Sequence, residues 1–162
     1  MISPEYLASS LGRNVQIIKN QVDGLSHEDC LIQLPFRGNC MNWIIGHLVL
    51  NRNNILILIE AESLIDPISV ERYKRDSEPI TEESSDILSL EILMELLDQA
   101  QGNIANLLQG MTPDKLQKQV AFFGNTKMTV GEWLIFFYFH DSYHTGQAEI
   151  MRQATGVDDK II

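Results

Sequence analysis

Apolar residues recur at steps of three and four along much of this chain, which predicts amphipathic α-helices. The clearest segment runs from about Ser84 to Gln109, and its spacing is typical of packing in a helical bundle. Gly110 and Pro113 follow this segment as terminators. Its core face is predicted to consist of Leu90, Leu93, Leu97, Ala100, Ile104 and Leu107.

Three further segments carry the same spacing and predict three more helices. The first runs from about Pro4 to Val22 with Ser3 as its N-cap, and the second runs from about Asn42 to Ala61. The last runs from about Thr129 to Ala154, where Glu132 can complete a capping box. Together the four segments predict an all-α fold, a four-helix bundle.

The length of 162 residues fits one domain that spans residues 1–162. Residues 62–83 carry Pro67 and Pro79 and lack clean periodicity, so we expect a long connection that folds over the bundle. Residues 120–128 predict a short hairpin or an extended turn. The run from Ile55 to Ile59 is apolar on every side, which a small monomeric bundle does not require, and a subunit interface is expected there.

The charge balance argues against anionic partners. The chain carries 12 Lys and Arg residues and 22 Asp and Glu residues, and its formal charge of -10 repels phosphate backbones and anionic lipid. We therefore expect no nucleic-acid partner and no membrane partner. No stretch approaches the roughly 20 apolar residues of a membrane span, and residues 1–13 lack a signal-peptide pattern, so a cytoplasmic location is expected. Cys30 and Cys40 fit neither a disulfide framework nor a zinc-binding pair, and free thiols are expected.

Three histidines are placed to share one ligand. His140 and His144 are four residues apart, which puts them on nearly the same side of a helix, about 6 Å apart along its axis. A third ligand has to come from another helix, and His47 is the histidine available on an inward-facing apolar stripe. The alternative is a set of ordinary core histidines, although each unpaired ring nitrogen then costs roughly 1 to 3 kcal/mol. Spacing alone leaves both interpretations open.

Two motifs resemble the DinB/YfiT-like family of metalloenzymes. They are Gly46-His47-Leu48, and the segment His140-Asp141-Ser142-Tyr143-His144-Thr145-Gly146-Gln147. The resemblance covers nearly the whole chain, and no ligand position is substituted. It implies a four-helix bundle with up-down-down-up connections and a long crossover between the second and third helices. It also implies a divalent metal ion on His47, His140 and His144, and commonly a homodimer.

Such a metal site has the composition of a catalytic centre. An ion held by three neutral imidazoles keeps its full charge and at least one open position. There it lowers the pKa of a bound water or thiol, and it can also polarise a substrate carbonyl. Zinc, nickel, iron and manganese all remain candidates, because imidazole suits several of these ions.

Polar residues near the histidines are weaker catalytic candidates. Asp141 is turned by about 100° from His140 on a helix, so it either orients an imidazole or lies on the surface. Asn51 and Gln147 can hydrogen-bond a bound ligand or make ordinary interhelical hydrogen bonds. His27 has polar neighbours and belongs to no motif, and we expect it to be exposed and dispensable.

Three functions follow from these patterns. The first is a metal-dependent S-transferase that uses a low-molecular-weight thiol, such as bacillithiol, mycothiol or glutathione, on small electrophiles, as relatives within the resembled family do. The second is a metal-dependent hydrolase of small substrates, in which the ion activates water. The third is a non-enzymatic, stress-associated metal-binding dimer. The sequence offers no obvious general base that would separate them.

Overall fold

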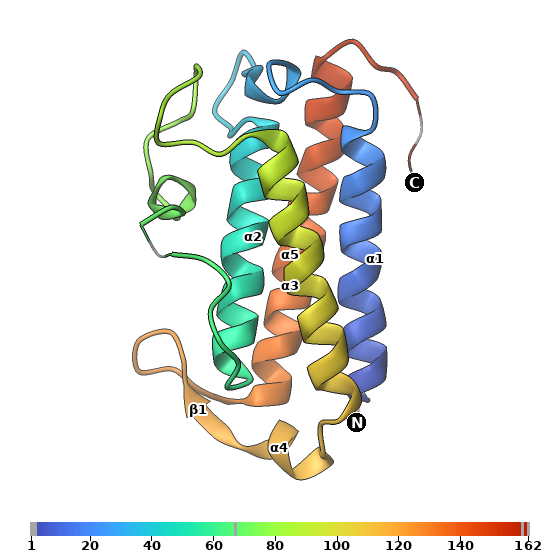
Figure 1. The fold of residues 1–162 in the computed structure, drawn as a ribbon, viewed down its shortest axis with the longest axis vertical. Helices are drawn as coiled ribbons and strands as arrows, with labels where there is room; N and C mark the ends of the chain where they lie inside the picture. The colour runs from blue at the N-terminus through green and yellow to red at the C-terminus, as the bar shows by residue number, and fades with distance from the viewer. Residues whose placement is uncertain (1–2, 67, 160, 162) are drawn as a thin grey trace.

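Four long helices form the body of the protein (Figure 1). The computed structural model describes residues 3–66, 68–159 and 161. Helices α1 (Pro4–Val22) and α5 (Val130–Ala154) run in one direction, and α2 (Met41–Leu58) and α3 (Leu90–Gln109) run in the opposite direction. This arrangement confirms the predicted all-α bundle and its up-down-down-up connections.

The packing of the helices brings the two histidine-bearing helices together. Helix α1 packs against α3 and α5, and α2 packs against the same two helices, so α2 and α5 share a direct contact. Buried apolar residues from all four helices fill the space between them. The packed core therefore fixes the positions of the side chains that α2 and α5 direct inward.

Capping side chains fix the helix starts as the sequence predicts. The Ser3 hydroxyl accepts a hydrogen bond from the Tyr6 backbone N–H at the start of α1. At the start of α5, Thr129 and Glu132 form the reciprocal capping box. These two ends are confirmed to the residue.

Helices α2 and α3 are shorter than predicted. Helix α2 ends at Leu58 rather than near Ala61, because Glu60 adopts a φ of 63°, which a right-handed helix cannot include. Helix α3 begins at Leu90 rather than near Ser84. Its N-cap is Ser89, whose hydroxyl accepts a hydrogen bond from the Ile92 N–H, a backbone donor of the first turn that has no partner within the helix.

One predicted core position on α3 is wrong. Leu107 is 43% exposed, whereas Leu108 is fully buried. Leu108 lies four residues after the buried Ile104, so the buried stripe simply continues with a step of four.

The run from Ile55 to Ile59 is buried mainly within its own chain. Ile55, Leu56 and Leu58 belong to the core, and Ile57 alone in this run is exposed, at 48%. The segment after α3 covers this end of α2, since Met111 and Val120 lie beside Leu58 and Ile59. The run does not require a second subunit for its burial, and that reason for an interface was wrong.

The connections carry the small elements. Residues 23–40 contain the 3-10 helix η1 (Asp29–Leu31), and the long crossover from α2 to α3 contains η2 (Glu71–Tyr73). Pro67, which the sequence placed in this crossover, lies outside the described residues. Helix α4 (Pro113–Gln117) precedes an antiparallel hairpin of β1 (Gln119–Ala121) and β2 (Lys127–Thr129), with Val120 opposite Met128. The hairpin confirms the prediction for residues 120–128.

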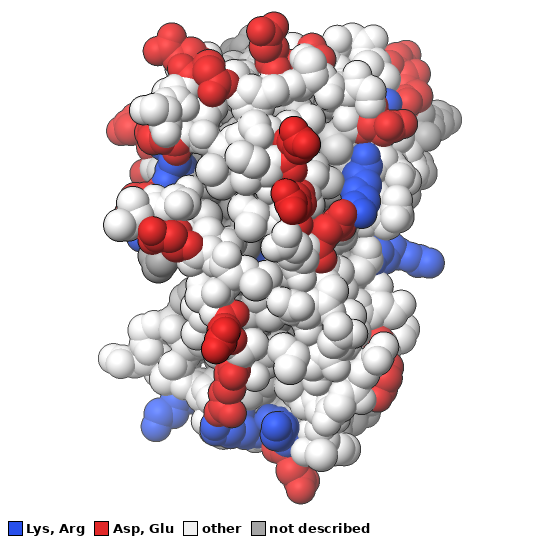
Figure 2. Space-filling view, viewed as in Figure 1, with Lys and Arg blue, Asp and Glu red and all other residues white. Residues whose placement is uncertain are grey.

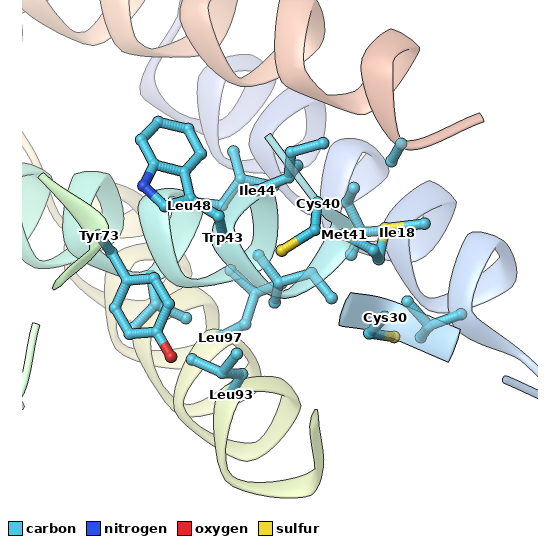
Figure 3. Packing of buried hydrophobic residues seen from close by; sticks show 14 of the residues in the cluster. Ile18, Cys30, Cys40, Met41, Trp43, Ile44, Leu48, Tyr73, Leu93 and Leu97 are labelled. Atoms are coloured by element: carbon cyan, nitrogen blue, oxygen red, sulfur yellow. The ribbon is translucent and has the colours of Figure 1, made fainter. Parts of the chain in front are cut away.

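The crossover is anchored to the bundle by a buried tyrosine. Figure 3 shows Tyr73 among buried residues of α2 and α3, including Trp43 and Leu93. The Tyr73 hydroxyl donates to Asn42 Oδ1 at 3.2 Å and accepts from the Leu88 N–H at 2.7 Å. These hydrogen bonds fix the position of the crossover along the axis of α2.

The charged side chains of the protein are mainly acidic. On the face shown in Figure 2, acidic side chains are scattered over the whole height, and basic side chains form no continuous track. No described helix is long and apolar enough to cross a membrane.

Candidate metal centre

The bundle brings His47, His140 and His144 to one point between α2 and α5. Each ring offers a nitrogen within 4.8 Å of the nitrogens of the other two. Nε2 of His47 and Nε2 of His140 lie 3.3 Å apart. His47 and His144 are buried, and His140 is half-buried. The two motifs therefore meet in space as their spacing predicts.

Hydrogen bonds orient two of the rings. His47 Nδ1 lies 2.7 Å from the Tyr73 carbonyl oxygen, which can only accept, so Nδ1 carries the proton. His144 Nδ1 lies 2.8 Å from Gln147 Oε1, which fixes the same tautomer. In both rings Nε2 is left with its lone pair, which is the form in which histidine ligates a metal.

This donor set fits a divalent ion. His140 Nε2 can donate a hydrogen bond to the lone pair of His47 Nε2, and a divalent cation bound by the three rings would take the place of that proton. Bonding of the opposite ring nitrogen to a carbonyl is also the usual arrangement around metal-ligating histidines. The three histidines can therefore hold a metal ion, and His47, His140 and His144 are the residues that would bind it.

The electrostatics keep the site neutral. Burial lowers the pKa of His47, and it lowers the pKa of His144 to about 4, with the neighbouring histidines as the next cause. Both rings are consequently neutral near pH 7, with their single proton on Nδ1, so an ion does not have to displace a proton from Nε2 of either ring.

Gly46 allows Tyr73 to reach His47. A Cβ atom at Gly46 would lie 2.2 Å from Tyr73 Cδ1, which is far inside contact distance. The absence of a side chain leaves room for the Tyr73 ring against α2, and the Tyr73 carbonyl accepts a hydrogen bond from His47 Nδ1. On the other side, the Trp43 ring stacks on His47 with centroids 4.5 Å apart and planes 12° apart. The glycine before the histidine is thus part of what positions the ring.

Asp141 is neither a surface carboxylate nor a hydrogen-bond partner of a histidine. Its side chain is fully buried and forms an ion pair with Arg52 at 2.9 Å. Arg52 also donates to Gln101 Oε1 and to the Leu11 carbonyl, so the pair links α5 to the other three helices. The distance of 3.8 Å from Asp141 Oδ1 to His140 Nδ1 is too long for a hydrogen bond. The influence of Asp141 on the histidines is therefore mainly electrostatic, through its buried charge.

The remaining candidates make bonds within their own helices. Asn51 donates its amide hydrogen to the His47 carbonyl at 2.8 Å, and Gln147 accepts from His144 and donates to the Tyr143 hydroxyl. Within the part of the chain that the structure describes, neither makes the interhelical hydrogen bond of the alternative interpretation. Asn51 also lines the pocket described below, where a bound ligand would meet it.

His27 lies beside the start of α3, and its environment differs from the exposed position that was predicted. It is half-buried, it pairs with Glu83, and its Nδ1 accepts a hydrogen bond from the Leu90 N–H at 3.1 Å. It joins the connection after α1 to the first turn of α3, which periodicity does not reveal. His27 is a structural histidine rather than a dispensable one.

A pocket of about 500 Å³ opens beside the histidines. Helix α2 contributes Leu50, Asn51 and Asn54 beside His47, and α5 contributes Phe136 beside His140. The crossover adds Lys74 and Arg75, and the hairpin turn adds Phe123. The sequence did not identify these last three residues, because their segments have no periodicity that would place them near α2 and α5.

The two cysteines are not at this site. Cys30 and Cys40 are free and fully buried, as predicted for thiols without a disulfide. Burial raises the pKa of Cys30 to about 12 and also raises that of Cys40. Neither supplies a thiolate near neutral pH, so any thiol chemistry at the histidines needs a thiol from solution.

Comparison with known proteins supplies the family. The model of the DinB superfamily matches residues 14–148, a span that includes all three site histidines. The chain belongs to the DinB superfamily. A solved structure, described as that of a conserved protein from Enterococcus faecalis, is similar to this chain with a TM-score of 0.73. The two are 14% identical, over 96% of this chain and 98% of that one, which shows that they share a fold and no more. A search of curated proteins found no match.

Proposed function

We propose that this DinB-superfamily protein is a divalent-metal-dependent enzyme that transfers a low-molecular-weight thiol to small electrophiles. The observation that carries the proposal is the convergence of three histidine rings, two of them fixed as Nε2 ligands, at the edge of an open pocket. When bound, a zinc, nickel, iron or manganese ion supplies an open position where a thiol loses its proton near neutral pH.

The reaction balances without a redox partner. The thiol proton leaves to solvent, the sulfur forms a bond to the electrophilic carbon, and the leaving group departs with its electron pair. His47, His140 and His144 hold the ion, and the pocket walls hold the electrophile next to it. The burial of both cysteines favours an external thiol over a cysteine of the chain.

The alternatives make different demands on the site. A hydrolase of small substrates would use the same ion on water, but the described residues that line the pocket include no carboxylate to act as a general base. The third function, a non-enzymatic metal-binding dimer, would require an ion that is fully enclosed by the protein. The pocket beside His47 and His140 supports an enzyme over that third function.

Metal content tests the first half of the proposal. Protein purified without a nickel column is expected to carry about one divalent ion per chain by elemental analysis. His144→Ala is expected to lose the ion, whereas His27→Ala removes the one histidine outside the site and is expected to keep it. Equal metal content in wild type and His144→Ala would contradict the three-histidine site.

Thiol consumption tests the second half. The loaded protein is incubated with bacillithiol, mycothiol or glutathione and a model electrophile such as a chloronitrobenzene, and the loss of thiol is followed. We expect turnover that stops on chelation and is absent in His144→Ala. Turnover of an ester, amide or lactone panel without added thiol would support the hydrolase instead.

We also propose a homodimer. Helix α5 exposes several large apolar side chains on one stretch of surface, including Phe139 at 68% and Tyr143 at 59%. Light scattering is expected to give twice the chain mass of 18.4 kDa. Phe139→Ser is expected to shift the protein toward monomer, and a monomeric wild type would refute the dimer.

A further inference from the structure

The pocket beside the histidines has two chemically different walls. Phe123 and Phe136 form one wall as an edge-on pair with ring centroids 6.2 Å apart. Phe136 continues to His140, with centroids again 6.2 Å apart, so the aromatic surface reaches the proposed metal ligands. Lys74 and Arg75 lie on the crossover side of the same pocket. A ligand that fills the pocket therefore meets rings and cations together.

The two cations are held in place by the same segment that orients His47. Tyr73 accepts from His47 Nδ1 through its carbonyl, and Lys74 and Arg75 are the next two residues. The segment is braced further along, where Ser77 donates to the Arg72 carbonyl and accepts from the Trp43 indole N–H. The backbone that carries the cations is thus fixed relative to α2.

The charges around the pocket favour an anion. Lys74 pairs with Glu71, and Arg75 lies 3.8 Å from Asp76, but these are exposed pairs that contribute little. The Arg75 side chain is 90% exposed and can turn toward a ligand without losing a buried contact. None of the described residues that line the pocket is acidic, although the chain as a whole carries a net charge of -10. Two cationic side chains in the lining of a pocket on an acidic protein can select ligands by charge.

We propose that the substrate is a small organic anion whose carboxylate binds Lys74 and Arg75 while its apolar body lies against Phe123 and Phe136. Asn51 and Asn54 line the α2 side, where amides can hydrogen-bond a polar group between these two ends. The reactive carbon then lies toward the histidines. This inference rests on the proposed metal-dependent transfer for its reactive end, and its binding end is independent of the metal.

The test compares two ligands of the same shape in metal-free protein. Phenylacetate and its neutral amide, phenylacetamide, are titrated into chelator-treated protein at low salt by NMR, so that the carboxylate has no ion to coordinate. Two exposed cations are expected to make phenylacetate bind about threefold to tenfold tighter than the amide. The preference is expected to shrink as salt is added. Resonances of the Asn51 and Asn54 side-chain amides are expected to shift.

A matched pair of variants isolates the two cations. Lys74→Gln/Arg75→Gln is expected to bind both ligands equally. Arg37→Gln/Lys115→Gln removes one exposed Arg and one exposed Lys outside the pocket and is expected to keep the preference. Equal binding of the two ligands by wild type overturns the inference, and so does an equal loss of preference in both double variants.

The metal content of the same samples separates the two proposals. Protein that binds no metal but prefers phenylacetate through Lys74 and Arg75 refutes the proposed function and keeps the anion site. Protein that binds metal at the histidines but treats the two ligands alike keeps the proposed function and refutes the anion site.

Discussion

The histidines of the site differ in how the protein holds them. His47 and His144 each donate through Nδ1 to an oxygen, and burial lowers the pKa of both. His140 is less buried, and its Nδ1 makes no hydrogen bond to any described residue. Two rings are therefore prepared as neutral ligands, and His140 is the ring with freedom to adjust when an ion binds.

The lowered pKa of His144 predicts that the metal-free protein loses stability on acidification. The unfolded chain takes up a proton near the ordinary pKa of 6.5, whereas the folded chain does so only near pKa 4. Between these pH values the unfolded state binds the proton alone, so the free energy of unfolding falls as pH decreases and the loss levels off near pH 4. His144 contributes on the order of 3 kcal/mol to this loss.

Urea unfolding of chelator-treated protein in steps from pH 7 to 4 measures the effect. His144→Gln has no titrating group at this position and is expected to show a shallower pH dependence, which also cancels the contribution of the carboxylates common to both proteins. Identical slopes for the two proteins would contradict the assignment to His144.

Among individual residues, spacing on a helix decided what could be predicted. His47, His140 and His144 lie on regular helices, where a step of four fixes relative direction, and the structure brings them together. Tyr73 could not be predicted, because it reaches His47 through its backbone carbonyl from an irregular segment. A backbone acceptor has no residue type that marks it in a sequence.

Where the crossover meets α2, Gly46→Ala is expected to cost about 1 to 3 kcal/mol of stability, the usual effect of overpacking a core. The new methyl would overlap the Tyr73 ring, which cannot retreat because it is fully buried and hydrogen-bonded at its hydroxyl. Any shift of Tyr73 also moves the carbonyl that orients His47, so metal affinity should fall with stability.

Urea unfolding and a metal titration measure the two effects of Gly46→Ala. Gly102→Ala is the control, because a Cβ at Gly102 in α3 meets nothing within 4 Å. That variant is expected to be neutral or more stable by up to about 1 kcal/mol, since alanine favours the helix. Equal stability of Gly46→Ala and wild type would show that the Tyr73 ring does not exclude a side chain at position 46.

The ends of helices were predictable where the sequence contains capping residues. They were less predictable where the end depends on an unusual backbone conformation or on a distant residue. The box of Thr129 and Glu132 fixes the start of α5 from local residue types. The early end of α2 depends on the positive φ of Glu60, a residue type with no special preference for that conformation. The late start of α3 accompanies the bond from Leu88 to Tyr73, a partner 15 positions away in the chain.

Across the bundle, the site couples metal binding to folding, because the three ligands come from two helices that only the folded chain brings together. An ion at about 100 times its dissociation constant stabilises such a protein by about 2.7 kcal/mol. For a chain of this length that corresponds to a rise of roughly 5 to 10 °C in melting temperature. Chelation of the loaded protein is expected to reverse the rise.

Differential scanning calorimetry with and without a chelator measures this coupling in three proteins. Wild type and His27→Ala are expected to lose the same number of degrees on chelation, although His27→Ala starts lower because it lacks the bond to the first turn of α3. His144→Ala is expected to melt at one temperature in both conditions. A protein that contains metal by elemental analysis yet melts unchanged after the metal is removed would carry its ion somewhere other than between α2 and α5.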